Sequence, residues 1–141
     1  MSITTRVTRQ SSYRKVVGGY RTAIERVIAS SIQDVMNTAK QSIQQHGSSD
    51  VTYKKYNPKR THTASAPKNP PNSDTGFLVS NIHAVMDADK LGGAVESRAD
   101  YSVFLEFGTS NMQERPFLQP ALEENKPKIR AKFKKLRARF T

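Results

Sequence analysis

The segment 101–124, YSVFLEFGTSNMQERPFLQPALEE, carries the most distinctive pattern of the chain. An aromatic and apolar run ends in the Glu-Phe-Gly of residues 106–108, and a short polar loop leads to the Arg-Pro-Phe-Leu of residues 115–118. We expect the aromatic run to be buried, as a short helix or a strand. The second half predicts the start of a helix, whose first turn accommodates Pro116 and Pro120 because backbone donors there lack partners anyway.

Glu106 is the one acidic residue within the aromatic run, and we expect it to have a structural role. It is expected either to pair with Arg115 or Arg98, or to accept backbone donors at a tight turn at Gly108. Glycine at that position supplies a left-handed backbone conformation that other residues rarely adopt. Service as a general base is the alternative, but neither a second carboxylate nor a nucleophile accompanies Glu106 in the sequence.

The segment from Ser12 to Gln45 predicts a long amphipathic helix, because its apolar residues recur at spacings of three and four. Gly18 and Gly19 each cost about 1 kcal/mol in a helix, so we expect the firm helix to begin near Tyr20. At about 1.5 Å per residue the helix is roughly 40–50 Å long. This length is large for so small a chain, and we therefore expect part of the apolar stripe to pack on another subunit.

A second amphipathic helix is predicted from Phe117 to Phe140, with Pro127 expected to kink or briefly interrupt it. Its apolar face holds Leu118, Leu122, Ile129, Phe133, Leu136 and Phe140. From Lys126 to Arg139, eight of fourteen residues are Lys or Arg and none is acidic. We expect these charges to lie opposite the apolar face and to contact DNA or an acidic partner, a purely solvated face being the alternative. The residues concerned are Lys128, Arg130, Lys132, Lys135, Arg137 and Arg139.

Between the helices the sequence predicts a small antiparallel sheet within residues 80–107. Asp74 is expected to cap a single helical turn over 77–80. A half-buried strand follows, and residues 94–98 are expected to be the returning strand of a hairpin. The inward positions of the first strand are predicted to be Ile82, Ala84 and Met86.

Two further segments are expected to be irregular. Residues 1–11 are polar and basic and are interpreted as a flexible arm. Residues 48–73 hold four of the seven prolines and are interpreted as an extended Pro-rich loop with at most a short strand at 51–53. This loop places tyrosines among cations, which suits contact with nucleic acid or a neighbouring protein. These residues are Tyr53, Lys54, Lys55, Tyr56, Lys59 and Arg60.

Together these elements predict a single α+β domain, residues 1–141, with a long N-terminal helix, a small antiparallel sheet and a C-terminal amphipathic helix packed on the sheet. The chain has no cysteine, which excludes disulfides and thiolate chemistry. Its three histidines, at positions 46, 62 and 83, have neither metal-ligand nor triad spacing. We therefore expect no enzyme activity, no metal and no cofactor.

The composition indicates a protein that depends on partners. Hydrophobic residues make up 35% of the 141, whereas compact domains typically run nearer 45–50% with glycine included. The net charge of +11 favours a polyanion or an acidic protein as neighbour. No apolar run approaches the roughly 18 residues of a membrane span, and the first residues lack a signal-peptide core. We expect a soluble protein made in a cytoplasm, without a membrane partner.

Two segments resemble the signature of a family of long-tailed bacteriophage proteins, the neck or tail-completion proteins related to lambda minor tail protein Z. The downstream segment resembles the family's Glu-aromatic-Gly-Thr element, Met-containing loop and Arg-Pro-Phe-Leu-x-Pro-Ala-Leu helix start. The upstream segment resembles its Asp-Thr-Gly-x-Leu element, although Asn81 departs from the simplest form of the pattern. The matching residues are Asp74, Thr75, Gly76, Leu78, Ile82, Glu106, Gly108, Arg115, Pro116, Phe117, Leu118, Pro120 and Leu122.

The resemblance implies a structural virion protein, part of a ring in the neck that joins or completes the tail around the DNA path. The implied partners are copies of the chain in a hexameric ring and adjacent head-closure, tail-terminator or tail-tube proteins, with non-specific contact to genomic DNA. The implied location is the virion, after assembly in the host cytoplasm. From the residues alone, the alternative is a basic nucleic-acid-binding module without sequence specificity.

Overall fold

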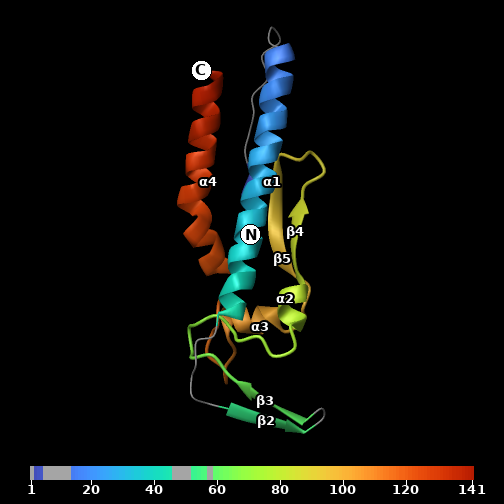
Figure 1. Ribbon diagram of the computed structural model, residues 1–141, viewed down its shortest axis with the longest axis vertical. Helices are drawn as coiled ribbons and strands as arrows, with labels where there is room; N and C mark the ends of the chain where they lie inside the picture. The colour runs from blue at the N-terminus through green and yellow to red at the C-terminus, as the bar shows by residue number, and fades with distance from the viewer. Residues whose placement is uncertain (1, 5–13, 46–51, 57–58) are drawn as a thin grey trace.

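The computed structural model describes residues 2–4, 14–45, 52–56 and 59–141 (Figure 1). Its elements in chain order are β1 (Ser2–Thr4), α1 (Arg14–Gln44), β2 (Thr52–Tyr56), β3 (Lys59–Thr63), α2 (Phe77–Ser80), β4 (Ile82–Met86), β5 (Gly92–Ser97), α3 (Ser102–Phe107) and α4 (Leu118–Phe140). The α+β class expected from the sequence is confirmed.

The two long helices build the core. α4 lies along α1, and the other side of α1 packs on β4 and β5, so that α1 stands between α4 and the sheet (Figure 1). From Ile24 to Ile43 the apolar stripe of α1 is covered, with no member more than 2% exposed; its members are Ile24, Ile28, Ile32, Val35, Ala39 and Ile43. The expectation that part of this stripe needs another subunit is therefore wrong for the described residues.

The first turns of α1 are helical through both glycines, rather than only from Tyr20 as expected. Tyr20 packs edge-on against Phe140 with ring centroids 4.9 Å apart, which ties this end of α1 to the last turn of α4. The carbonyl of Gly18 also accepts the Thr22 hydroxyl at 3.1 Å. Tertiary packing of this kind outweighs the low helix propensity of glycine.

The predicted hairpin is confirmed as β4 and β5, paired antiparallel from Ile82↔Ser97 to Met86↔Gly93. A third strand joins them, because β1 pairs antiparallel with β5 and places Ser2 opposite Ala94. The prediction of a flexible arm is thus wrong for residues 2–4, while the rest of that arm lies outside the described residues.

The inner face of this sheet is only partly covered. Ile82 and Val95 are buried, whereas Ala84 and Met86 are exposed, so the predicted burial of those two positions is wrong. The pairing places Ala84 opposite Val95 on the same face, and α1 covers that face without extending over Ala84. At Gly93 α1 approaches closely, since a Cβ there would lie 2.1 Å from Ile32 Cδ1.

The predicted Pro-rich loop contains regular structure. β2 and β3 pair antiparallel from Thr52↔Thr63 to Tyr56↔Lys59, and the hairpin projects beyond α3 at one end of the molecule (Figure 1). The threonines and tyrosines of these two strands favour an extended chain, which the prolines of the segment did not suggest. Of the rest of this loop, residues 64–73 are described, and they are irregular.

The short turn before the sheet forms as predicted, but Asp74 does not cap it. Gly76, with φ of 78°, occupies the N-cap of α2, and the Thr75 hydroxyl accepts the Phe77 N–H at 3.3 Å. Asp74 Oδ1 instead lies 3.7 Å from His62 Nδ1.

α4 begins at Leu118, one residue later than predicted, and runs through Pro127 without a break. The fully buried Asn125, which the sequence pattern did not single out, donates to Thr38 Oγ1 of α1 and to the Ala121 carbonyl, both at 2.8 Å. Among the described helices none has the length and apolar character needed to cross a membrane.

Candidate assembly surface

The distinctive segment forms a rigid corner between α3 and α4, and Glu106 holds it. Its carboxylate accepts the backbone N–H groups of Phe117, Leu118 and Gln119 at 2.9, 3.1 and 2.7 Å. The first N–H groups of a helix lack partners inside the helix, and the N-terminus attracts negative charge. Glu106 is therefore the N-terminal cap of α4, supplied from a helix eleven residues upstream. The expected structural role is confirmed, although the donors lie at α4 and not at the Gly108 turn.

Gly108 has the expected positive φ, at 73°. A Cβ there would lie 2.8 Å from the Met112 carbonyl oxygen and 2.9 Å from the Glu114 nitrogen, so the turn has no room for a side chain. The turn closes by exchange of hydrogen bonds between Thr109 and Met112. This geometry returns the chain so that Glu106 meets the start of α4.

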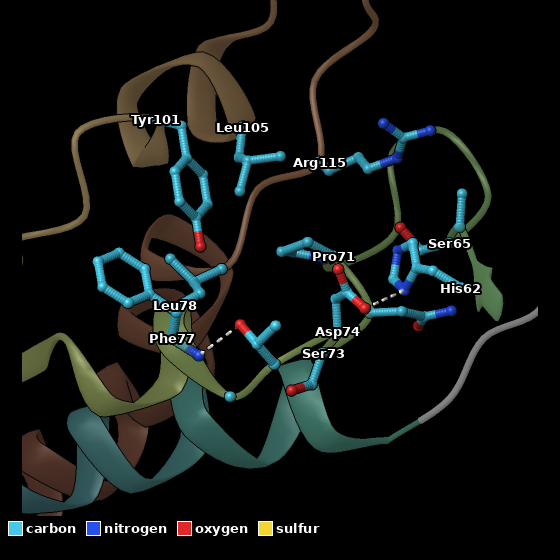
Figure 2. A pocket seen from close by; sticks show the side chains of 14 residues that line it. His62, Ser65, Pro71, Ser73, Asp74, Phe77, Leu78, Tyr101, Leu105 and Arg115 are labelled. Atoms are coloured by element: carbon cyan, nitrogen blue, oxygen red, sulfur yellow. Dashed lines mark hydrogen bonds and ion pairs between the residues drawn. The ribbon is translucent and has the colours of Figure 1, made fainter. Parts of the chain in front are cut away.

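The predicted ion pairs of Glu106 are wrong. Arg98 Nε pairs with Glu96 Oε1 at 2.9 Å. Arg115 donates its backbone N–H to the Leu105 carbonyl at 2.6 Å, while its side chain extends toward the loop that carries Ser65 (Figure 2). Arg115 Nε and Ser65 Oγ are buried, and neither has a hydrogen-bond partner among the described residues.

The aromatic run is a helix, α3, but the prediction that it is buried is wrong. The protein has seven exposed large hydrophobic side chains in its described part, and five of them lie on or beside α2 and α3. They are Phe77, Tyr101, Val103, Phe104 and Phe107, of which Phe107 is 76% exposed. A concentration of exposed apolar side chains marks an interaction surface. A six-residue helix can bury only one side, and here Leu105 and Glu106 face inward.

Two hollows flank α3. The first is a groove of about 610 Å³ between α3 and the start of α4, whose apolar lining includes Val103, Phe107, Pro116 and Leu118 and whose edge carries Glu114. We call it the α3–α4 groove. It lies directly on the capped corner, so the Glu106 hydrogen bonds set its shape.

The second hollow, of about 410 Å³, lies between α2, α3 and the irregular loop. Figure 2 shows Tyr101 and Leu105 entering it from α3, opposite Asp74 and His62. Burial raises the pKa of the Tyr101 hydroxyl, and the nearby Asp74 carboxylate raises it further. No group of three His, Asp or Glu residues in the described chain could hold a metal ion.

The cations of α4 form two stripes and not the single outward face that was expected. Lys128, Lys132, Lys135 and Arg139 recur at spacings of four and three, and Arg130, Lys134 and Arg137 form a second such series. At 3.6 residues per turn these series flank the buried line of Ile129 and Leu136 on opposite sides. The side chain of Lys132 contacts α1, where it donates to Asp34 Oδ2 at 2.5 Å and to Ser30 Oγ. The other predicted contact residues are exposed.

The remaining motif residues serve packing. Leu78, Ile82 and Phe117 are buried, and Leu118 and Leu122 pack against the core from its edge. Pro116 lies just before α4, and Pro120 is exposed in its first turn. The motif thus brings Glu106, Gly108 and residues 115–122 together, while residues 74–76 border the second hollow.

No protein-family model, curated protein or solved structure matches the chain.

Proposed function

We propose that the protein is a structural subunit of a tailed-phage virion, which forms a homo-oligomeric ring in the neck and joins or completes the tail around the DNA path. The observation that carries the proposal is the rigid α3–α4 corner, whose segment has the family-like sequence and whose aromatic side chains face outward. Exposed aromatic side chains gathered in this way are typical of protein–protein contacts, which supports the proposal. The capping role of Glu106 accounts for the acid in this segment, because its carboxylate accepts three backbone N–H groups of the α4 start.

The proposed assembly is a hexameric ring in contact with head-closure, tail-terminator or tail-tube proteins. A head-to-tail contact repeated around an axis closes into a ring and covers the same two surfaces on every subunit. The exposed cations of α4 suit such a place, because an acidic neighbouring ring or the DNA backbone relieves their mutual repulsion. Phosphate contact of this kind has no base preference.

The test is a nonsense mutation of this gene in the phage genome that encodes it, with complementation by a plasmid copy. We expect filled heads and tails that remain separate or unfinished in electron micrographs, and antibody labelling of the complemented particles at the neck. Normal infectious particles without the protein would overturn the proposal.

A second candidate is a basic module that binds nucleic acid without sequence specificity. The exposed cations of α4 favour it, because they can neutralise phosphates, each of which contributes about 0.9 to the slope of log affinity against log salt. It predicts tight, salt-sensitive binding of duplex DNA by the isolated protein together with its absence from purified particles. This candidate is excluded if the protein is present in purified particles and the isolated protein has negligible affinity for DNA.

A further inference from the structure

The β2–β3 hairpin is a projecting arm whose pairing is internal. Its described contacts are chiefly between its own two strands, and it extends beyond α3 at the end of the molecule (Figure 1). A two-stranded hairpin alone is marginally stable in water at best. The pair of His62 and Asp74 anchors the hairpin at its base, and its exposed face is open to contact with another molecule.

One face of this hairpin has a defined chemistry. Tyr56 is 79% exposed, and it lies opposite Lys59 in the pairing, so both side chains leave the same face. Lys54, two residues before Tyr56, shares this face and is also exposed. The whole segment 52–63 holds four Lys or Arg residues and no acid. The face thus offers an aromatic ring between two ammonium groups.

The α3–α4 groove offers the complement. Its lining from Val103, Phe107 and Pro116 is apolar, and Glu114 at its edge is exposed. A tyrosine ring buries a large apolar area and tolerates a wet edge for its hydroxyl. Lysine ammonium groups beside the ring would meet the Glu114 carboxylate at the edge of the groove, where charge pairing fixes register.

Among the described residues the two surfaces do not meet within one chain, because none of those in the hairpin lines the groove. We infer that the hairpin of one subunit docks in the α3–α4 groove of the adjacent subunit, with Tyr56 against Val103 and Phe107 and with Lys54 or Lys59 against Glu114. The contact joins two different surfaces of the same chain and is therefore heterologous, the type that closes into rings. This inference rests on the proposed function, which it deepens by naming the subunit contact.

Nucleic acid is the other chemical class that would suit a basic hairpin with an exposed tyrosine. It does not account for the groove, whose apolar side chains lie beside two acidic residues, Glu106 and Glu114. A second copy of the chain accounts for both surfaces at once. Binding of DNA at the hairpin is thus an outcome that would overturn the inference.

The absence of native cysteine permits a direct test by cross-linking. Thr61→Cys lies on the Lys54 side of the hairpin, since Thr61 pairs with Lys54, and Gln119→Cys lies on the groove while its backbone N–H stays bonded to Glu106. Particles carrying both substitutions are treated with a short bis-maleimide and run on a denaturing gel. We expect a ladder up to the full ring. The control pair is Thr61→Cys with Met86→Cys, which places the second thiol at the exposed end of β4 and should give no ladder.

Charge reversal supplies the second arm. Lys54→Glu together with Lys59→Glu should reduce the ladder at least roughly tenfold, since like charges across a contact are strongly unfavourable. Adding Glu114→Lys should restore it. Unchanged thermal unfolding of each variant shows that the fold is intact.

The outcomes separate the two proposals. Three results overturn the hairpin contact while the protein is still found at the neck, so that the neck function stands. They are the lack of a ladder, equal ladders from both cysteine pairs, and a ladder that charge reversal leaves unchanged. Protein absent from particles that are normal without it overturns the neck function. Protection of the Thr61→Cys thiol by duplex DNA, without a ladder, assigns the hairpin to nucleic acid.

Discussion

Removal of the Glu106 carboxylate should uncouple α3 from α4. The carboxylate accepts three backbone N–H groups at 2.7 to 3.1 Å, two of them partly buried. Loss of an N-cap side chain typically costs about 0.5–2 kcal/mol, and the charge at a helix N-terminus contributes about 0.3–1 kcal/mol more. Hydrogen bonds to charged groups are each worth about 1.5–3 kcal/mol, but water can replace the exposed one at Gln119.

We therefore expect Glu106→Ala to lower the free energy of unfolding by about 2–4 kcal/mol. Glu106→Gln should cost about 1–2 kcal/mol, because it keeps one acceptor oxygen but presents an amide donor to a helix end that also donates. The assay is urea unfolding followed by circular dichroism, with the slope of free energy against urea checked for constancy.

The matched control is Glu124→Gln, an exposed acid in the early part of α4 whose loss should change stability by no more than about 0.5 kcal/mol. A Glu106→Ala protein as stable as this control would refute the reasoning. It would mean that the α4 start is held by packing of Phe117 and that the carboxylate is dispensable.

Four further outcomes can be measured. Phe117→Ala should cost about 3–5 kcal/mol in urea unfolding, because the ring is 0% exposed; wild-type stability would show that our packing is wrong. Gly93→Ala should cost about 1–3 kcal/mol in the same assay, since its Cβ would also lie 2.6 Å from a β4 carbonyl oxygen; an unchanged midpoint would contradict the close approach of α1. The pKa of the Tyr101 hydroxyl is raised in the folded protein, so folding favours the protonated hydroxyl. The stabilisation linked to this proton is complete below about pH 10, the ordinary pKa of tyrosine, and is lost as the pH rises through the pKa of Tyr101 in the folded protein. The free energy of unfolding of Tyr101→Phe should therefore fall less steeply above about pH 10 than that of the wild type. Identical pH profiles of the two proteins would contradict this prediction. Replacing three exposed α4 cations, Arg130, Lys135 and Arg137, with Gln should preserve the fold and lower the yield of infectious particles, with the largest difference from wild type at low salt. An unchanged yield would mean that these cations form only a solvated face.

The helices and the β4–β5 hairpin were predictable because their patterns are local. Apolar spacing of three and four over 31 residues identifies α1, and the alternation after Ile82 identifies a strand. The spacing of apolar residues does not predict which element of the chain covers the apolar face of a given helix or strand. The stripe of α1 meets α4 and the sheet of its own chain, while Met86 and the aromatic residues of α3 remain uncovered.

The site was predictable in kind but not in its contacts. An acid within an aromatic run indicated a structural role for Glu106, yet the donors lie eleven to thirteen residues away along the chain. The hydrogen bonds between Glu106 and the α4 start depend on the tight turn at Gly108. The spacing of apolar residues in the sequence does not predict the geometry of that turn. The β2–β3 hairpin was missed because the prolines of segment 48–73 and the lysines of the strands weighed against it, whereas the threonines and tyrosines of the strands gave the usable signal.

The separation of α1 and α4 along the chain has a consequence for synthesis. The two helices that complete the core are separated by 73 residues, from Gln45 to Phe117. At 5–20 residues per second a ribosome needs roughly 4–15 s to cover that interval. During this time the isoleucine stripe of α1 is without its main cover, and a nascent chain is open to chaperones or to aggregation. Once α4 has been synthesised, its packing on α1 buries the stripe and also brings the start of α4 to the Glu106 carboxylate. The α3–α4 groove therefore forms only on subunits whose core is complete.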